Sequence, residues 1–259
     1  MTETFDAGWL ALREPYDHAA RAGIAADLLA ELAARRPLHV VDLGAGSGSN
    51  LRCLAPHLGP QQAWRLLDAD AGLLAGIAAP PGTTVATEVA DLSAIEAVAL
   101  GADLVTATAF LDLVSADWLA RLVACLDGAA VLFALTYDGR IDWDPLDPSD
   151  ALARELVNRH QRTDKGFGPA LGPEAAHQAV HLLKGAGYAV MTADTAWRLG
   201  PGDAALQHAL LSGYRGAAAA VAPDRAGDIA AWASRREALI AAGNSRLTVG
   251  HTDLWAPAL

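Results

Sequence analysis

The sequence predicts an α/β protein with a doubly wound, mostly parallel, seven-stranded sheet that carries helices on both faces. Apolar runs of strand length alternate with segments of helical spacing, a pattern typical of a parallel sheet joined by crossover helices. A glycine-rich turn at residues 44–48 follows the first apolar run. The chain has 259 residues, 53% of them hydrophobic, and is long enough to bury one large core. We expect a single domain over residues 1–259.

Composition disfavours several classes of protein. The chain has 19 Lys and Arg residues against 30 Asp and Glu residues, and its formal charge of −11 disfavours RNA or DNA as a partner. The sequence shows no secretory signal and no run of about 18 uncharged apolar residues, so we expect a cytoplasmic protein without a membrane anchor. Cys53 and Cys125 lie in apolar stretches far from any Cys/His cluster, which indicates reduced, buried thiols.

Residues 1–36 are expected to form a helical segment ahead of the sheet. Asp17 is a suitable N-cap for a helix over residues 18–35. The apolar face of this helix carries Leu28, Leu29 and Leu32.

Five strands joined by four helices follow this segment. The apolar runs predict strands at residues 38–43, 64–68, 83–89, 102–108 and 129–137. Helical spacing predicts the intervening helices at residues 48–57, 70–79, 92–99 and 115–126. Ligands of such sheets bind beyond the carboxyl ends of the strands. The acidic residues Asp42, Asp68 and Asp91 should therefore meet in one crevice.

Two segments interrupt the alternation. Residues 138–172 combine a Pro/Asp-rich stretch, a predicted helix at 151–162 and a Gly/Pro-rich loop, and we expect this insertion to bind the substrate. Residues 200–243 form a second, helical elaboration. The remaining predicted elements are helices at 174–186, 203–220 and 224–242 and strands at 188–195 and 246–254.

The turn Gly44-Ala45-Gly46-Ser47-Gly48 predicts a binding site for a nucleotide-like cofactor. Its glycines can adopt positive φ and leave the backbone bare, so a ligand can reach the N–H groups at the start of the next helix. Asn50 and Leu51 stand where a dinucleotide fingerprint would carry its third glycine, which disfavours a pyrophosphate ligand.

Four motifs in this order resemble those of the class I S-adenosylmethionine-dependent methyltransferases. They are the acidic-x-G-x-G-x-G turn at 42–48, Asp68 after the second strand, Asp91 after the third, and the fourth-strand segment 103–114. The resemblance covers roughly residues 10–195 and implies S-adenosyl-L-methionine as the cofactor. The cofactor-binding residues that it implies are Asp42, Gly44, Ala45, Gly46, Ser47, Asn50, Asp68, Ala69, Asp91, Leu92, Thr106 and Ala109.

The same resemblance implies a methyltransferase for an oxygen or nitrogen of a small molecule. It also implies that residues 1–36 fold over the cofactor as a lid and that a seventh strand runs antiparallel beside the sixth. Arg13, Tyr16 and Trp9 of the lid are then candidate substrate-binding residues, although the aromatic pair could simply pack the helix onto the sheet. Asp112 occupies a position where relatives carry a polar active-site residue, although it could instead cap the next helix.

Basic residues concentrate at 154–165, where four of the chain's 19 fall. Arg159 and Arg162 share a helix face and, with Lys165, could hold an anionic or polyhydroxylated metabolite. Neutralising Arg159 and Arg162 would then raise the KM for the acceptor and leave cofactor affinity unchanged. The alternative is a solvated helix whose charges pair with Glu155 and Asp164.

Methyl transfer to a hydroxyl or ammonium group needs a proton acceptor as well as positioning. His160 is the first candidate because an imidazole accepts a proton near neutral pH. Tyr137 and Asp138 are further catalytic candidates because they follow the fifth strand. A structural role for His160 is the alternative, and no Cys/His spacing predicts a metal site.

Other functions are weaker interpretations of the same chain. A nucleotide-dependent oxidoreductase should carry a third glycine near Leu51 and a Tyr-x-x-x-Lys pattern, and neither is present. An RNA or protein methyltransferase is disfavoured by the charge and by the absence of an N-P-P-Y-like tetrapeptide at 107–110. A non-catalytic S-adenosylmethionine-binding protein would show the same motifs. Tryptophans such as Trp232 or Trp255 could line a homodimer contact or pack the terminal helices.

Overall fold

A computed structural model describes residues 6–35, 37–97 and 101–259 of the chain. Residues 1–5 and 36 of the predicted lid, and 98–99 of the helix predicted at 92–99, lie outside the described residues.

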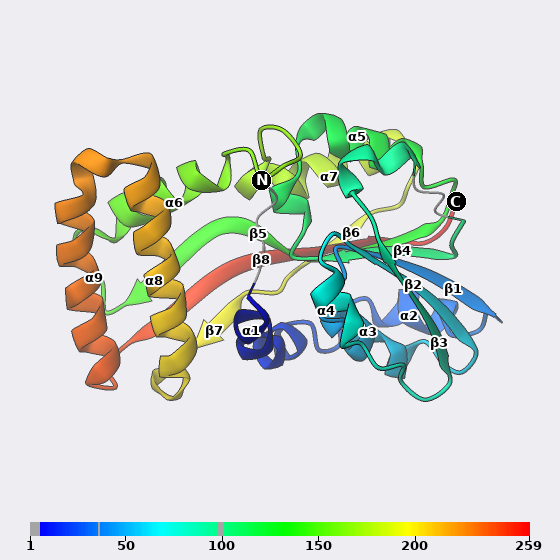
Figure 1. The fold of residues 1–259 in the computed structure, drawn as a ribbon, viewed down its shortest axis with the longest axis horizontal. Helices are drawn as coiled ribbons and strands as arrows, with labels where there is room; N and C mark the ends of the chain where they lie inside the picture. The colour runs from blue at the N-terminus through cyan, green and yellow to red at the C-terminus, as the bar shows by residue number, and fades with distance from the viewer. Residues whose placement is uncertain (1–5, 36, 98–100) are drawn as a thin grey trace.

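Within the described residues, eight strands form one sheet with the order β3-β2-β1-β4-β5-β8-β6, and β7 pairs with β8 (Figure 1). The strands from β1 to β5 are parallel, and β8 lies antiparallel between β5 and β6. The fold class predicted from the sequence is confirmed, including the antiparallel last strand. The strands are β1 (Leu38–Leu43), β2 (Gln62–Asp68), β3 (Thr83–Val89), β4 (Leu104–Thr108), β5 (Ala130–Asp144), β6 (Met191–Asp194), β7 (Trp197–Leu199) and β8 (Arg246–Ala256).

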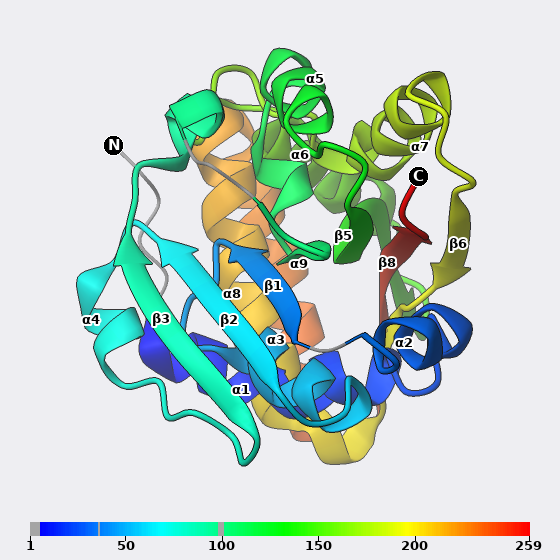
Figure 2. The same cartoon turned by 90° about the vertical axis from the view of Figure 1, so that its right-hand side faces the viewer.

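Helices cover both faces of this sheet: α5 and α7 lie on one side, and α1, α2 and α3 on the other (Figure 2). The α-helices are α1 (Ala7–Ala20), α2 (Ala26–Leu32), α3 (Ser49–Leu54), α4 (Ala71–Ala75), α5 (Ala116–Ala124), α6 (Asp150–Gln161), α7 (Ala175–Gly185), α8 (Ala204–Val221) and α9 (Ala226–Ala241). Short 3₁₀ helices occur at 55–57, 92–97, 111–113, 172–174, 201–203 and 223–225. No α-helix in the described ranges has the length and apolar character needed to cross a membrane.

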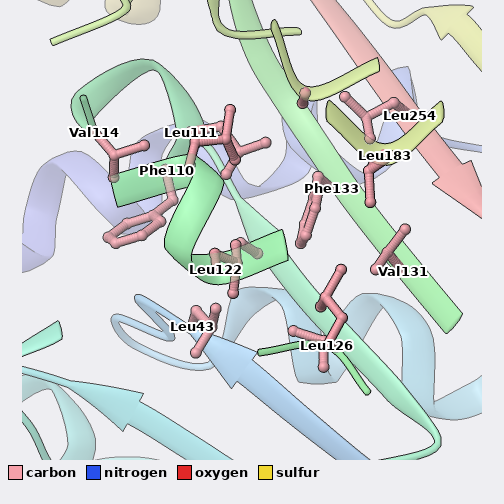
Figure 3. Close-up of a cluster of buried hydrophobic side chains, with 14 of the residues drawn as sticks. Leu43, Phe110, Leu111, Val114, Leu122, Leu126, Val131, Phe133, Leu183 and Leu254 are labelled. Atoms are coloured by element: carbon pink, nitrogen blue, oxygen red, sulfur yellow. The ribbon is translucent and has the colours of Figure 1, made fainter. Parts of the chain in front are cut away.

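The central strands β1, β4 and the first part of β5 are buried on both faces, because helices cover both sides of the sheet and successive residues of a strand point to opposite sides. Leu43, Val131 and Phe133 face a core shared with α5 and α7, and Figure 3 shows this cluster. Leu38 and Leu132 face a second core, shared with α2 and α3. The carboxyl ends of β1, β2 and β4 are thereby held in register at one edge of the molecule.

The N-terminal helix differs from the prediction of one helix over residues 18–35. The first helix begins at Ala7, because the carboxylate of Asp6 accepts a hydrogen bond from the backbone N–H of Trp9 at 3.1 Å. Asp17 is not a cap but a buried residue inside this helix. The helix is interrupted at residues 21–25, where Gly23 and Ala25 have positive φ, and α2 begins after this interruption.

Three further differences concern the length or the type of an element. The fifth strand, predicted at 129–137, continues to Asp144, so part of the expected insertion is strand. The strand predicted at 188–195 is shorter, and the extra three-residue strand β7 follows it. The helix predicted at 92–99 is a 3₁₀ helix over its described part.

The extended halves of β5 and β8 carry a third hydrophobic core together with α6, α8 and α9 (Figure 1). Trp143 and Trp232 pack edge to face in it, with ring centroids 6.3 Å apart. Trp232 is 1% exposed and its indole N–H donates to Asp150 at 2.8 Å, so it packs the helices and presents no dimer surface. Trp255 is half-buried.

One fully buried cation fixes α9 in this core. The guanidinium of Arg236 pairs with the carboxylate of Asp150, donates to the carbonyl of Pro145 at 2.6 Å, and stacks on Trp143. Its side chain is 0% exposed. Removing one partner of a buried ion pair leaves the other charge desolvated without compensation.

Arg236→Leu should therefore lower the free energy of unfolding by about 3 kcal/mol or more, because Asp150 loses its buried partner. Urea denaturation followed by circular dichroism measures this change. Arg225→Leu is a control just before the same helix, since the side chains of Arg225 and its partner Asp228 are both exposed and the loss of their pairing should cost far less. Equal losses in the two variants would contradict a specific role for the buried pair.

Candidate functional site

The glycine turn connects the end of β1 to the start of α3. Gly44, Gly46 and Gly48 all have positive φ, as predicted from their spacing. The ring of Phe110 lies against Gly44 so closely that a Cβ there would approach it to 2.6 Å. Any side chain at position 44 would therefore displace the loop that follows β4.

Asp68 joins the carboxyl ends of β1 and β2. One oxygen of its carboxylate accepts the backbone N–H of Gly46 at 2.7 Å, and the other accepts the N–H of Asp70 at 2.9 Å. Asp91, at the end of β3, is exposed, and hydrogen bonds from Ser93 lower the pKa of its carboxyl group. The two carboxylates thus stand at neighbouring strand ends, where a bound ligand can reach them.

Asp42 lies beneath the turn in a buried polar network. Asn50 donates to Asp42 at 2.8 Å and to the hydroxyl of Thr106 at 3.1 Å. Arg21, which is 6% exposed, donates to the side-chain oxygen of Asn50 at 3.0 Å. The second carboxylate oxygen of Asp42 has no hydrogen-bond partner among the described residues.

Burial raises the pKa of Asp42 to about 7, and the nearby charge of Asp68 adds to this rise. The hydrogen bond from Asn50 and the charge of Arg21 oppose it. Asp42 is therefore poised to change its charge near neutral pH, and an added positive charge nearby would favour its ionised form.

The other predicted cofactor residues are distributed around this network. The N–H of Ala45 donates to Leu67, the carbonyl of Ser47 accepts from Arg52, and the carbonyl of Leu92 accepts from Trp118. Ala69 follows β2, and Ala109 follows β4 with a φ of +49°.

A cavity of about 320 Å³ lies beside this turn, and we name it the α8 pocket. It joins residues from α1, the end of β4, β5, α6, β7, α8 and β8. Its lining consists of Trp9, Arg13, Ala109, Asp112, Leu113, Leu135, Tyr137, Val157, His160, Gln161, Lys165, Trp197, Ala209, Leu210, Gly213, Tyr214, Ala217, Val249 and His251. The 3₁₀ turn after β4 connects the two sites, because Phe110 contacts Gly44 while Ala109 and Asp112 line the pocket.

The structure brings some of the predicted substrate and catalytic residues into this pocket. Arg13, Asp112, Tyr137, His160 and Lys165 all line it. The amine of Lys165, a side chain that is 7% exposed, lies 3.4 Å from Nδ1 of His160. The hydroxyl of Tyr137 donates to Asn158 at 2.7 Å, and burial raises the pKa of Tyr137.

Four predicted residues lie outside the lining of the pocket. Tyr16 donates its hydroxyl to Asp203 at 3.0 Å, and Asp138 pairs with Arg140 at 2.6 Å. Arg159 donates to the carbonyl of Val221, and Arg162 lies 3.6 Å from Glu174. The two arginines thus share a helix but do not converge on one ligand.

Sequence reasoning named Trp9 and Tyr137 as candidates but gave no sign of Trp197 and His251, which join them into an aromatic row along this pocket. Trp9 packs edge to face on Trp197 at 6.5 Å, Trp197 on His251 at 4.7 Å, and His251 on Tyr137 at 6.5 Å. It also missed Tyr214 and the small residues of α8. These residues come from five elements up to 240 positions apart, so no local spacing could have grouped them.

The insertion predicted to cover the substrate packs onto the loop after β4. Phe167 contacts Phe110 and Trp118 edge to face, with centroids 5.5 and 5.7 Å apart. The backbone N–H of Leu171 donates to Val114 at 2.8 Å. A larger cavity of about 510 Å³, beside α2 and α3, contains none of the predicted site residues.

Comparisons with known proteins identify the fold. Neither a protein-family model nor a curated protein sequence matches the chain. The cyclopropane synthase MmaA2 from Mycobacterium tuberculosis is similar in structure, with a TM-score of 0.52 and 13% identity over 97% of this chain and 94% of that one. This likeness shows the Rossmann-like fold of the class I methyltransferases.

Two further solved structures are similar at lower scores. An inferred sarcosine dimethylglycine methyltransferase from Galdieria sulphuraria gives a TM-score of 0.46 and 16% identity over 94% of this chain and 86% of that one. Phosphoethanolamine N-methyltransferase 2 from Haemonchus contortus, in complex with S-adenosyl-L-methionine, gives 0.43 and 15% over 90% and 52%.

The titration of His251 tests whether this side chain is buried and neutral in the pocket wall. Burial, with Arg13 and Arg140 nearby, lowers the pKa of His251 to about 3. In the unfolded chain a histidine takes up a proton near pH 6.5. Between pH 6.5 and 3 the unfolded state therefore binds more protons, so acidification destabilises the fold.

His251→Gln lacks this titration. The free energy of unfolding of the wild type, relative to that of the variant, should fall by up to about 1.4 kcal/mol for each pH unit below 6.5. Urea denaturation at pH 7, 6 and 5 measures the difference. A difference that stays constant over this range would contradict a buried, neutral His251.

Proposed function

We propose that this protein is a class I S-adenosylmethionine-dependent methyltransferase that acts on an oxygen or nitrogen of a small molecule. The observation that carries the proposal is the adjacency of two sites. The glycine turn, with Asp42 and Asp68, adjoins the α8 pocket through the loop that follows β4 and through α1. A pocket of acceptor size beside the glycine turn favours an enzyme over a non-catalytic S-adenosylmethionine-binding protein.

The residues at the turn fit S-adenosylmethionine by charge and by shape. The cofactor carries positive charge, and the turn offers the carboxylates of Asp42, Asp68 and Asp91 at successive strand ends. The three glycines leave the backbone accessible, and one oxygen of Asp42 is buried without a partner. When bound, S-adenosylmethionine supplies an electrophilic methyl group.

The α8 pocket is proposed to hold the acceptor. A small anionic or polyhydroxylated acceptor is compatible with the positive charges of Arg13 and Lys165 in its lining. His160 is the proposed proton acceptor of the three predicted catalytic residues. It lines the pocket, whereas Tyr137 holds its proton and Asp138 pairs with Arg140.

Calorimetric titration with S-adenosylhomocysteine, and with NAD in parallel, tests the proposal. We expect S-adenosylhomocysteine alone to bind, at micromolar or lower concentration. Asp68→Ala should weaken this binding, because the carboxylate that joins β1 and β2 is removed. Binding of NAD alone, or of neither ligand, would refute the proposed cofactor.

Cofactor affinity should depend on pH through Asp42. Because the pKa of Asp42 is about 7, its carboxyl group is mostly neutral at pH 6 and mostly ionised at pH 7.5. A cationic cofactor favours the ionised form, so affinity for S-adenosylmethionine should rise roughly 5-fold over this range. Asp42→Asn should bind more weakly at pH 7.5 and show a flat profile.

Calorimetry in buffers of different ionisation enthalpy measures the number of protons released when S-adenosylmethionine binds. It therefore tests the ionisation of Asp42 independently of the affinity. Wild-type protein should release a proton on binding at pH 6.5, and Asp42→Asn should release less. Identical pH profiles for the two proteins would exclude Asp42 as the titrating group.

A further inference from the structure

One wall of the α8 pocket is a flat strip of small residues. Ala209, Gly213 and Ala217 follow one another at intervals of four along α8, so they share a helix face, and all three line the pocket. A Cβ built on Gly213 meets no atom within 4 Å. The space beside this wall is therefore open to a ligand.

Two polar atoms in the same lining lack partners. The hydroxyl of Tyr214 is buried, and so is Nδ1 of His251, whose residue is only 5% exposed. Neither atom has a hydrogen-bond partner among the described residues. Because buried polar groups in native proteins are almost always paired, these two atoms indicate a ligand that pairs them.

The remaining walls favour a flat, apolar ligand body. The aromatic row from Trp9 through Trp197 and His251 to Tyr137 runs along the pocket. Five aliphatic side chains line it as well, Leu113, Leu135, Val157, Leu210 and Val249, and its further polar side chains are those of Arg13, Asp112, His160, Gln161 and Lys165. Aromatic rings pack favourably on one another in offset or edge-to-face arrangements. The part of a ligand that lies between the strip of small residues and the aromatic row meets few polar partners, so a flat ring suits this part of the pocket better than the hydroxyl-bearing carbons of a sugar-like polyol.

From this geometry we infer that the methyl acceptor is a planar aromatic compound with ring hydroxyl groups. Its ring lies between the strip Ala209-Gly213-Ala217 and the aromatic row, and its hydroxyls pair with Tyr214 and His251. This inference rests on the proposed function and narrows its acceptor class.

A pair of glycines on α8 offers a matched test. Gly213 lines the pocket and is exposed, so Gly213→Leu places a side chain at the open side of the pocket. Gly213 has helical φ, so the backbone tolerates the change. Gly216→Leu is the control: it lies three residues further on the same helix, also meets nothing within 4 Å, and is exposed outside the pocket.

The ligands are two fragment panels, measured by saturation-transfer NMR with and without S-adenosylhomocysteine. One panel contains flat hydroxylated rings: phenol, catechol, 4-hydroxybenzoate and 3,4-dihydroxybenzoate. The other contains sarcosine, phosphoethanolamine, glycerol and glucose. We expect the rings to bind, with affinity reduced at least about 10-fold by Gly213→Leu and changed less than about 2-fold by Gly216→Leu.

Tyr214→Phe separates a ligand contact from a structural role. It removes an unpaired buried hydroxyl, so the stability of the free protein should stay equal or rise. Affinity for catechol-type rings should nevertheless fall roughly 3- to 10-fold. A loss of stability without a loss of ring binding would contradict the proposed pairing.

Several results would overturn the inference. Binding of the aliphatic panel without the rings, binding of neither panel, or ring binding that Gly213→Leu leaves unchanged would each do so. Failure of the proposed function is distinguishable, because it appears as absence of S-adenosylhomocysteine binding whatever the fragments do.

Discussion

The pairing of β5 with β8 is the constraint on which the rest of the structure depends. The two strands run antiparallel from the pair Val131 and Ala256 to the pair Asp144 and Arg246. The start of β5 and the end of β8 complete the central sheet, whereas the end of β5 and the start of β8 carry the core formed with α6, α8 and α9. The register shifts between Phe133 and Thr136, and again after Tyr137. Such irregularities bend a strand and redirect its side chains. The α8 pocket lies at this bend, where Leu135, Tyr137, Val249 and His251 line it.

A series of buried polar contacts connects the N-terminal segment to the glycine turn. Arg21 follows α1, and it reaches Asn50 in α3 and, at 3.4 Å, the carboxylate of Asp253 in β8. Asn50 in turn holds Asp42. Since buried polar groups are costly when unpaired, movement of the segment around Arg21 away from the sheet would disturb Asn50 and Asp42 as well. The position of the N-terminal segment and the charge state beneath the glycine turn are therefore coupled through these contacts.

The sequence predicts those parts of the molecule that are specified over short stretches of chain. The strands at 38–43 and 83–89 and the positive φ values of the glycine turn follow from local apolar runs and from glycine spacing. The start of α1 was predicted wrongly because Asp6 and Asp17 are both chemically suitable caps, and the buried pairing of Asp17 with Arg13 and Trp197 depends on the tertiary fold. The α8 pocket was beyond prediction because its lining reaches from Trp9 to His251. For Arg159 and Arg162 the local spacing was misleading. They lie three residues apart as expected, but Arg159 donates to Val221 and Arg162 lies near Glu174, so they do not bind one ligand together.

The glycine turn and the α8 pocket are supported by different hydrophobic cores. The residues around the glycine turn are held by β1, β2 and β4, whose cores involve α2, α3, α5 and α7. The small strip and Tyr214 belong to α8, which packs chiefly on α6 and α9 in the separate core. Substitutions on the inner face of α8 can therefore reshape the pocket while the packing beneath Asp42 and Asp68 stays intact. The loop after β4 belongs to both sites, because Phe110 rests on Gly44 while its neighbour Ala109 lines the pocket. Helix α1 also touches both, because Leu10 faces Gly46 while Trp9 and Arg13 line the pocket. Under the proposed function, acceptor choice would be set mainly by α8 and the far half of the β5–β8 pair, and cofactor binding by the strand ends.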